Sequence, residues 1–317
     1  MAAHNEYDHL GVRLILYTLL GCLVCISSSI SILVFSSKDL RTKYVMFIAL
    51  SFGDLANGLA FFLAGMFRIS FIKRGKFYVS TPSIECFSTP WAVLMIFSGQ
   101  FPALMNMFIT LQRVVAFDFA VYYRRVWKNS YNYCLIISAV FLAVISIVVA
   151  IVINSNDHRE NPTSICSVMQ TTGIIYGTIH YALIAFVYLF CSVVLYAIFN
   201  KMNSTRVPSA DDLRRQRMLL AINGVSVVLA SIPGLLVTLN EWKAPEIDDL
   251  IIGVAYCCYA MHSGLSLIIY LTFRPDFRRR FVLLLHINDT KRRARSCEVK
   301  SNHTHKIATL NVGQVQT

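Results

Sequence analysis

The stretch that decides the fold is residues 91–115, WAVLMIFSGQFPALMNMFITLQRVV, in which no charged residue occurs before Arg113. Cys86 lies shortly before this stretch. At the helical rise of about 1.5 Å per residue, Cys86 and Arg113 would lie roughly 40 Å apart. That distance is about the thickness of a bilayer with its headgroups. The stretch therefore predicts a spanning helix that connects a site near Cys86 with a site at Arg113.

The composition extends this prediction to most of the chain. Of the 317 residues, 56% are hydrophobic and 15% are charged, whereas a soluble domain carries about 25% charged residues. Seven apolar segments are long enough to cross a hydrocarbon core, which takes about 20 residues. These segments are 12–35, 44–68, 88–117, 131–153, 172–199, 218–239 and 250–273. Because a spanning helix satisfies its own backbone polar groups, we predict an all-α membrane protein, a seven-transmembrane helix bundle.

The predicted domain organisation follows from the same segments. It comprises a short extracellular N-terminus (1–11), the seven-span domain (12–273), an amphipathic membrane-surface helix (274–286) and a disordered cytoplasmic tail (287–317). In 274–286, four apolar residues recur at helical spacing between arginines, which is typical of a helix lying on a membrane. They are Phe277, Phe281, Leu284 and Leu285. The tail is basic and polar, a composition that favours disorder.

The distribution of basic residues predicts the orientation. With the C-terminus in the cytoplasm, 22 of the 29 lysines and arginines lie on the cytoplasmic side. This bias favours an extracellular N-terminus in a multi-pass protein of the plasma membrane, although the run Lys73-Arg74-Gly75-Lys76 opposes it. No cleavable signal peptide is expected. The net charge of +12 then indicates attraction to anionic membrane lipid, with no nucleic-acid partner.

A set of residues in the spans occurs in a recognisable order. The set is Leu40-Arg41-Thr42, Asp54, Cys86, Arg113, Tyr123, Cys166, Pro233, Tyr270 and Phe277. Over roughly residues 12–286 this order resembles rhodopsin-like (class A) seven-transmembrane G-protein-coupled receptors. Gln112, Ser231 and Ser266-Leu267 replace family motif residues, as in divergent nematode serpentine chemoreceptors. Gln112 replaces an acidic residue that holds the resting state in the family, which puts the basal activity of this chain in doubt.

The resemblance implies a disulfide between Cys86 and Cys166, which would tie the third helix to the second extracellular loop. Six of the nine cysteines lie within predicted spans and Cys297 lies in the tail, so Cys86 and Cys166 are also the only predicted outer pair. A disulfide persists on that oxidising side.

The resemblance also implies which residues couple to a heterotrimeric G protein. The expected activation residues are Asp54, Arg113, Tyr123, Tyr196, Pro233 and Tyr270. The sixth helix is expected to pivot at Pro233 and open a cleft between Arg113, Tyr196 and Tyr270. Two simpler alternatives stay open, because Asp54 could be a protonated packing group and Arg113 a basic anchor at the membrane surface.

The predicted ligand is a small molecule or short peptide in the outer half of the bundle. Met95 stands where amine receptors of the family carry an aspartate, which argues against a biogenic amine. The seventh span has no lysine, so a retinal Schiff base cannot form. The predicted ligand contacts are Met95, Tyr176, His180, Tyr256 and Tyr259. His180 could instead be satisfied by a neighbouring helix.

Two other classes of function are weighed against a receptor. A membrane-embedded metal hydrolase needs several His and carboxylate ligands at one depth, whereas the spans offer only His180, His262 and Asp54. A channel or transporter usually shows inverted repeats or broken helix pairs, and neither is visible in the sequence. We therefore predict a chemosensory receptor, no enzyme activity, no metal and no other cofactor.

Overall fold

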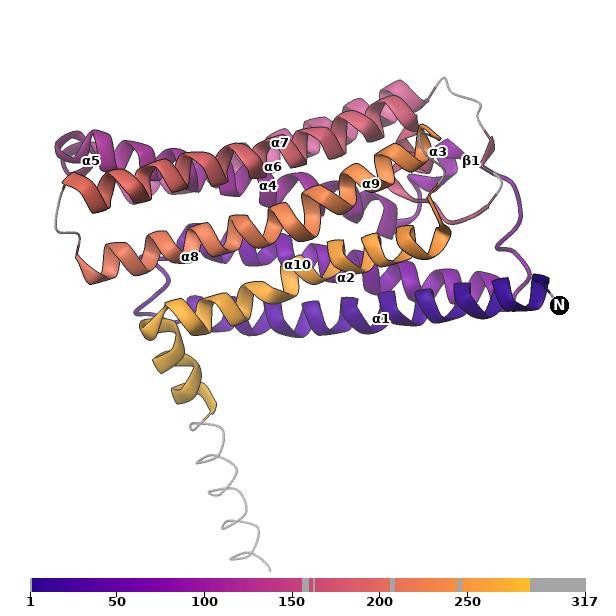
Figure 1. The fold of residues 1–317 in the computed structure, drawn as a ribbon, viewed down its shortest axis with the longest axis horizontal. Helices are drawn as coiled ribbons and strands as arrows, with labels where there is room; N and C mark the ends of the chain where they lie inside the picture. Colours follow the sequence, from indigo (N-terminus) through magenta and orange to yellow (C-terminus); the bar gives the residue numbers. More distant parts are fainter. Residues whose placement is uncertain (1, 156–159, 162, 206–208, 244–246, 286–317) are drawn as a thin grey trace, which may run out of the picture. The chain divides into compact units, whose positions relative to one another are not determined.

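A computed structural model describes residues 2–155, 160–161, 163–205, 209–243 and 247–285. Seven helices in these residues are long and apolar enough to cross a membrane, so the predicted all-α seven-helix fold is confirmed. Figure 1 shows them side by side. Six are α1 (Ala2–Phe35), α2 (Val45–Lys73), α4 (Pro90–Asp118), α6 (Asn129–Asn154), α7 (Val168–Thr205) and α10 (Asp249–Phe273). The other span is built from α8 (Ala210–Ser226), the π-helical turn η1 (Val227–Ser231) and α9 (Ile232–Glu241).

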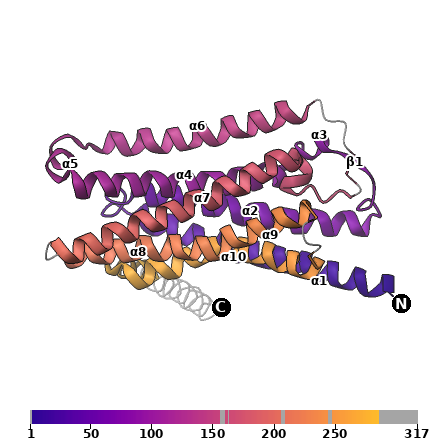
Figure 2. The same ribbon diagram turned by 45° about the horizontal axis from the view of Figure 1, so that its top comes forward.

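The short elements mark the two ends of the bundle. At one end lie the short helix α3 (Ser83–Cys86) and the strands β1 (Thr81–Pro82) and β2 (Glu160–Asn161), which pair antiparallel. The short helix α5 (Ala120–Val126) lies at the opposite end, near the start of α8 (Figures 1 and 2). We name these the disulfide end and the Arg113 end, after the residues described below.

The third span begins at Pro90, close to the predicted start at residue 88, and the helix does not continue back to Cys86. Helix α3 ends at Cys86, a turn follows, and α4 begins at Pro90. In the turn, the backbone N–H groups of Phe87, Ser88 and Thr89 donate to carbonyls three residues earlier. Proline lacks an N–H and has a fixed φ, so it starts a helix without losing a hydrogen bond. The rise of a single helix therefore does not measure the distance from Cys86 to Arg113.

The helices on both sides of the connection between the fifth and sixth spans extend beyond the predicted spans. The predicted spans end at residue 199 and begin again at residue 218, whereas α7 continues to Thr205 and α8 begins at Ala210. Ser209 caps α8 by accepting a hydrogen bond from the N–H of Asp212 at 3.2 Å. Within α7, Gly173 departs from helical geometry at a φ of 80°, a value that glycine tolerates.

Residues 275–285 form a further helix, as the sequence predicted for 274–286. This helix belongs to a second compact unit, residues 275–317, separate from the spanning unit. The apolar residues at 282–285 are exposed. A position on the membrane surface stays a prediction, and the tail 287–317 lies outside the described residues.

Helices α1 and α2 pack closely because glycines lie at their contact. A side-chain carbon added at Gly58 would lie 2.8 Å from the backbone nitrogen of Cys25, and one added at Gly21 would lie 2.4 Å from that of Phe62. Small residues allow such close backbone approach between helices in lipid. The α1–α2 contact therefore depends on the absence of side chains at these positions.

We expect Gly58→Ala to lower the melting temperature of the purified protein. The added methyl must push the helices apart, which costs about 1–3 kcal/mol. Gly11→Ala in α1 is the matched control, since no atom lies within 4 Å of the added carbon. Alanine's higher helix propensity should leave that control unchanged or slightly more stable. Equal melting temperatures for the two variants would contradict the contact.

Candidate functional site

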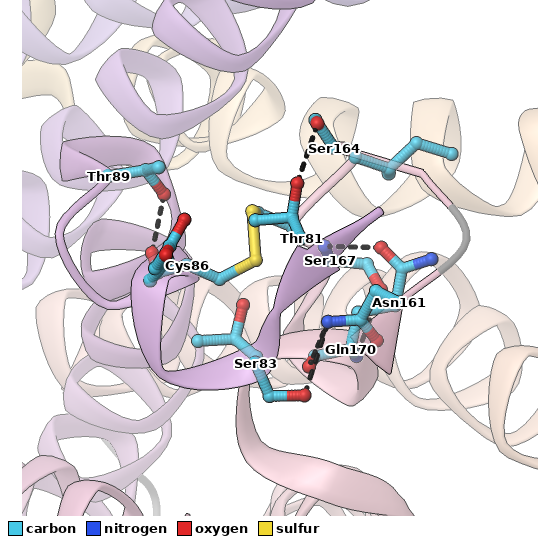
Figure 3. Close-up of a disulfide and its surroundings, with 12 residues drawn as sticks. Thr81, Ser83, Cys86, Thr89, Asn161, Ser164, Ser167 and Gln170 are labelled. Atoms are coloured by element: carbon cyan, nitrogen blue, oxygen red, sulfur yellow. Dashed lines mark hydrogen bonds between the residues drawn. A yellow bond between two sulfur atoms is a disulfide. The ribbon is translucent and has the colours of Figure 1, made fainter. Parts of the chain in front are cut away.

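A disulfide between Cys86 and Cys166 joins α3 to the segment that precedes α7, with a Cα–Cα distance of 5.3 Å. The predicted pairing is therefore present (Figure 3). Hydrogen bonds reinforce it: the hydroxyls of Thr81 and Ser164 share one at 2.8 Å, and Asn161 donates to the Ser83 hydroxyl at 3.1 Å. The disulfide and these hydrogen bonds thus hold the two segments together at the disulfide end.

A small cavity lies within the bundle, lined mainly by aromatic and aliphatic side chains. We name it the aromatic cavity; its lining is Phe61, Met95, Val168, His180, Tyr181, Pro233, Gly234, Val237, Ala255, Tyr256 and Tyr259. Four of the five predicted ligand residues are among these. The volume of this cavity is about 10 Å³, which is room for about one water molecule. A ligand would therefore have to displace side chains to enter it.

Only one of the two ring nitrogens of His180 has a hydrogen-bond partner in the described residues. Gln100 of α4 donates through Nε2 to His180 Nδ1 at 3.0 Å, which fixes the ring proton of neutral His180 on Nε2. Nε2 is buried and has no hydrogen-bond partner. A neighbouring helix thus satisfies one ring nitrogen, and the other is available to an acceptor in the cavity.

Tyr176 does not line the aromatic cavity, although it was predicted to contact ligand. Its hydroxyl donates to the backbone oxygen of Ser146 at 2.9 Å and meets the Ser146 hydroxyl at 2.5 Å. It also accepts from Gln100 at 3.3 Å. Tyr176 therefore ties α7 to α6 and helps to position Gln100 beside His180.

A larger cavity lies closer to the disulfide end and has polar and charged walls. We name it the Arg68 cavity; its lining is Leu10, Arg13, Leu14, Tyr17, Arg68, Phe77, Met95, Ile165, Ser167, Gln170, Asn240, Glu241, Ile252 and Tyr256. Its volume is about 210 Å³. Met95 and Tyr256 line this cavity and the aromatic cavity, so the two adjoin through these side chains.

A buried polar network links α2, α4 and α10. Asp54 is 4% exposed and has Ser263 and Ser266 as side-chain hydrogen-bond partners. Asn57 donates to the Ser263 hydroxyl at 3.0 Å, and Ser98 donates to Asn57 at 3.4 Å. A change in the relative position of these helices must therefore rearrange buried hydrogen bonds.

The Arg113 end contains the largest of the described cavities, about 430 Å³. We name it the Arg113 cleft; its lining is Arg113, Ala116, Phe117, Ala120, Tyr123, Arg124, Ile198, Met202, Ser209, Asp212, Arg215 and Gln216. Among the described residues, Arg113 has no hydrogen-bond or ion-pair partner, and its Nε is buried. The side-chain amide of Gln112 donates to Tyr123 and to Asn132, both at 3.0 Å. Gln112 therefore does not restrain Arg113.

Tyr123 has a pKa raised by burial, so its phenol stays protonated at neutral pH. The hydrogen bond from Gln112 opposes this shift in part. Tyr123 also stacks on Trp127, with ring centroids 5.1 Å apart. It is thus a fixed, neutral wall of the cleft.

Of the three residues predicted to form the cleft, the structure places only Arg113 there. Tyr196 is 59% exposed and points away from the bundle. Tyr270 is fully buried and packs edge-on against Phe35 and Phe47, at 4.9 and 6.0 Å between centroids. Ile198 of α7 faces the cleft instead.

One composite helix connects the aromatic cavity with the Arg113 cleft. Pro233 lines the cavity, and Arg215 lines the cleft. Between them, the π-helical turn Val227–Ser231 directly precedes the proline segment. Pro233 was predicted to mark an irregular helix, and the irregular residues lie before it. A π-helical turn is an adjustable point and is common at functional sites.

Asp211 holds the start of α8 to two other elements, which the sequence did not indicate. Its carboxylate pairs with Arg274 at 3.3 Å and with Lys43 at 3.6 Å. Arg274 is 1% exposed and lies over the ring of Tyr44, 4.8 Å from its centroid. The contact joins the sixth span to the end of the seventh and to the connection between the first two.

Sequence reasoning also missed Gln100 and the burial of Arg68. A signal for both was present, because polar and charged side chains are rare within apolar spans and indicate function. No such signal existed for Asp211, whose partner lies 63 positions away. In the described part of the chain, no three His, Cys, Asp or Glu side chains gather where they could hold a metal ion.

Comparison with known proteins does not assign the chain to a family. No protein-family model matches the chain, and no curated protein matches it either. The argument for a function therefore depends on the two cavities at the disulfide end, the composite helix and the Arg113 cleft.

Proposed function

We propose that the chain is a G-protein-coupled receptor, a divergent rhodopsin-like chemoreceptor. It binds a small molecule or short peptide at the disulfide end and activates a heterotrimeric G protein at the Arg113 end. The observation that carries this proposal is the Arg113 cleft of about 430 Å³, in which the guanidinium of Arg113 has no partner among the described residues.

The chemistry of the cleft suits a protein segment that carries acceptors. Arg113, Arg124 and Arg215 supply donors, while Ile198 and Met202 supply an apolar wall. A buried polar group without a partner is unfavourable, and backbone carbonyls or a terminal carboxylate would satisfy it. An amphipathic helix inserted in an apolar groove is a common mode of peptide recognition. The cleft thus supports docking of the end of a G-protein α-subunit.

The composite sixth span offers a route between ligand and G protein. Ligand contacts at Pro233 act on one side of the π-helical turn, and the cleft lies on the other side. A ligand shifts the equilibrium only if it binds the open arrangement more tightly. The proposed ligand therefore favours a state in which the α8 segment has moved away from the rest of the Arg113 end.

The proposed location is the plasma membrane, with the disulfide end outside and the Arg113 end in the cytoplasm. Two independent features support this orientation. A disulfide persists in an oxidising compartment, and with the C-terminus in the cytoplasm the sequence predicts 22 of the 29 basic residues on the cytoplasmic side.

The ion pairs of Asp211 are the proposed resting restraint. Arg113 lacks the acidic neighbour that restrains its counterpart in the resembled family, since residue 112 is glutamine. Asp211 instead fixes the start of α8 to the buried Arg274. Outward movement of α8 must break this pair, so the pair opposes the open state.

We expect Asp211→Asn to raise basal G-protein activation about fivefold, which corresponds to a coupling free energy at the lower end of the common range. The measurement needs no ligand: the purified chain in lipid nanodiscs is mixed with each class of G-protein α-subunit, and nucleotide exchange is followed. Asp118→Asn is the matched control. It removes an exposed carboxylate that pairs with Lys201 of α7 at 2.7 Å and does not line the Arg113 cleft.

Exchange equal to that of empty nanodiscs, for both the native chain and Asp211→Asn with every α-subunit, would contradict the receptor proposal. Ion or solute flux through vesicles in the same preparation would favour the channel or transporter alternative.

A further inference from the structure

Arg68 is a buried cation that forms no ion pair with the described residues. Its side chain is 5% exposed, and its Nε donates to the backbone oxygen of Ile165 at 2.8 Å. Within the described ranges, no carboxylate forms an ion pair with Arg68, and its two terminal nitrogens have no hydrogen-bond partner. A guanidinium that is buried in this way is strongly unfavourable unless an anion pairs with it.

The open space beside Arg68 is the Arg68 cavity. Charged side chains line this cavity: Arg13, Arg68 and Glu241. The flat fork of an arginine matches the two oxygens of a carboxylate.

We propose that the Arg68 cavity binds the carboxylate of a small organic acid, with the two terminal nitrogens of Arg68 donating to its two oxygens. The role of this acid as the activating ligand rests on the proposed receptor function. Its binding does not, because binding can be measured with no G protein present.

The apolar part of the acid is placed by the side chains that both cavities share. Met95 and Tyr256 line the Arg68 cavity and the aromatic cavity. Methionine is unbranched and adapts its shape readily, so displacement of Met95 opens the aromatic cavity to an apolar group. The ligand class is therefore a carboxylate joined to a short aromatic or aliphatic group that points toward His180.

The test compares a carboxylic acid with its neutral amide analogue. The full chain in nanodiscs is titrated with 3-phenylpropionate and with 3-phenylpropanamide, and the melting temperature is recorded. We expect the acid to stabilise the protein with a Kd of about 1 mM or tighter, as its size allows. The amide partitions into lipid at least as well but lacks the charge, so it should stabilise the protein at least about tenfold less well.

Two arginine variants locate the effect. Arg68→Gln should weaken acid binding at least about tenfold. Arg74→Gln is the matched control, because Arg74 follows the same helix, is exposed, and does not line the cavity. Should Arg68→Gln fail to fold, Arg68→Lys keeps the charge but loses the fork, and it should bind the acid several-fold more weakly.

Each other result overturns the proposal. Equal stabilisation by acid and amide would mean apolar binding only, and no stabilisation by the acid up to about 10 mM would mean that the cavity does not take this class. Unchanged acid binding by the Arg68 variants would place the acid elsewhere. Tighter binding of 2-phenylethyl phosphate would assign the site to a dianion. None of these results affects the exchange assay that tests the Arg113 cleft.

Discussion

Arg113→Ala is expected to reduce G-protein activation to near background without changing the stability or the membrane insertion of the protein. Arg113 is the cation in the cleft that has no partner among the described residues, so its removal deprives the docked protein of charged hydrogen bonds. Such bonds contribute about 1.5–3 kcal/mol, so the loss of exchange should be at least about tenfold.

The sharpest form of this experiment places Arg113→Ala in the Asp211→Asn background, where basal exchange is expected to be high. Arg217→Ala in the same background is the control. It removes one exposed arginine of α8, the helix that contributes Arg215 to the cleft, and Arg217 does not line the cleft. Full exchange by the Arg113 variant would exclude the cleft as the coupling site.

Replacing both Cys86 and Cys166 by serine is expected to produce the largest loss of stability. The disulfide spans 80 positions, and removal of such a crosslink typically costs about 2–5 kcal/mol. The loss should also reach the Arg68 cavity, because the backbone oxygen of Ile165, next to Cys166, accepts the hydrogen bond from Arg68. We expect a lower melting temperature together with weaker binding of 3-phenylpropionate.

The control is Cys134→Ser, a free and exposed cysteine in α6. It should melt like the native chain. A thiol reductant should lower the melting temperature of the native protein to that of the double serine variant and leave the variant itself unchanged. A double variant as stable as the native chain would mean that the hydrogen bonds around Thr81 and Asn161 are sufficient.

Four predicted ligand residues line one cavity, although they come from segments that are far apart in the sequence. Met95, His180, Tyr256 and Tyr259 come from three helices. Tyr176, one turn before His180, shares a helical face with it, yet the hydroxyl of Tyr176 reaches Ser146 of α6. Spacing along a helix predicts which residues share a face, but one face is wide enough to contact two neighbouring helices.

The three residues predicted to form the cleft do not lie together in this structure, for a related reason. Tyr196 and Tyr270 occur at the expected positions along their helices, but one faces outward and the other is buried among Phe35 and Phe47. In lipid, apolar side chains surround a helix on all sides, so the pattern carries little information about its rotation. Packing against neighbouring helices fixes that rotation.

The sequence alone determined that this protein is an all-α bundle of seven spanning helices, because an uncharged stretch such as residues 91–111 has one stable arrangement in lipid. It also indicated the Cys86–Cys166 pair. Only the tertiary structure decided that Arg113 has no partner among the described residues, that Asp211 holds Arg274, and that Arg68 is buried beside a cavity. These features depend on distances between side chains far apart in sequence, and such distances exist only once the helices have packed.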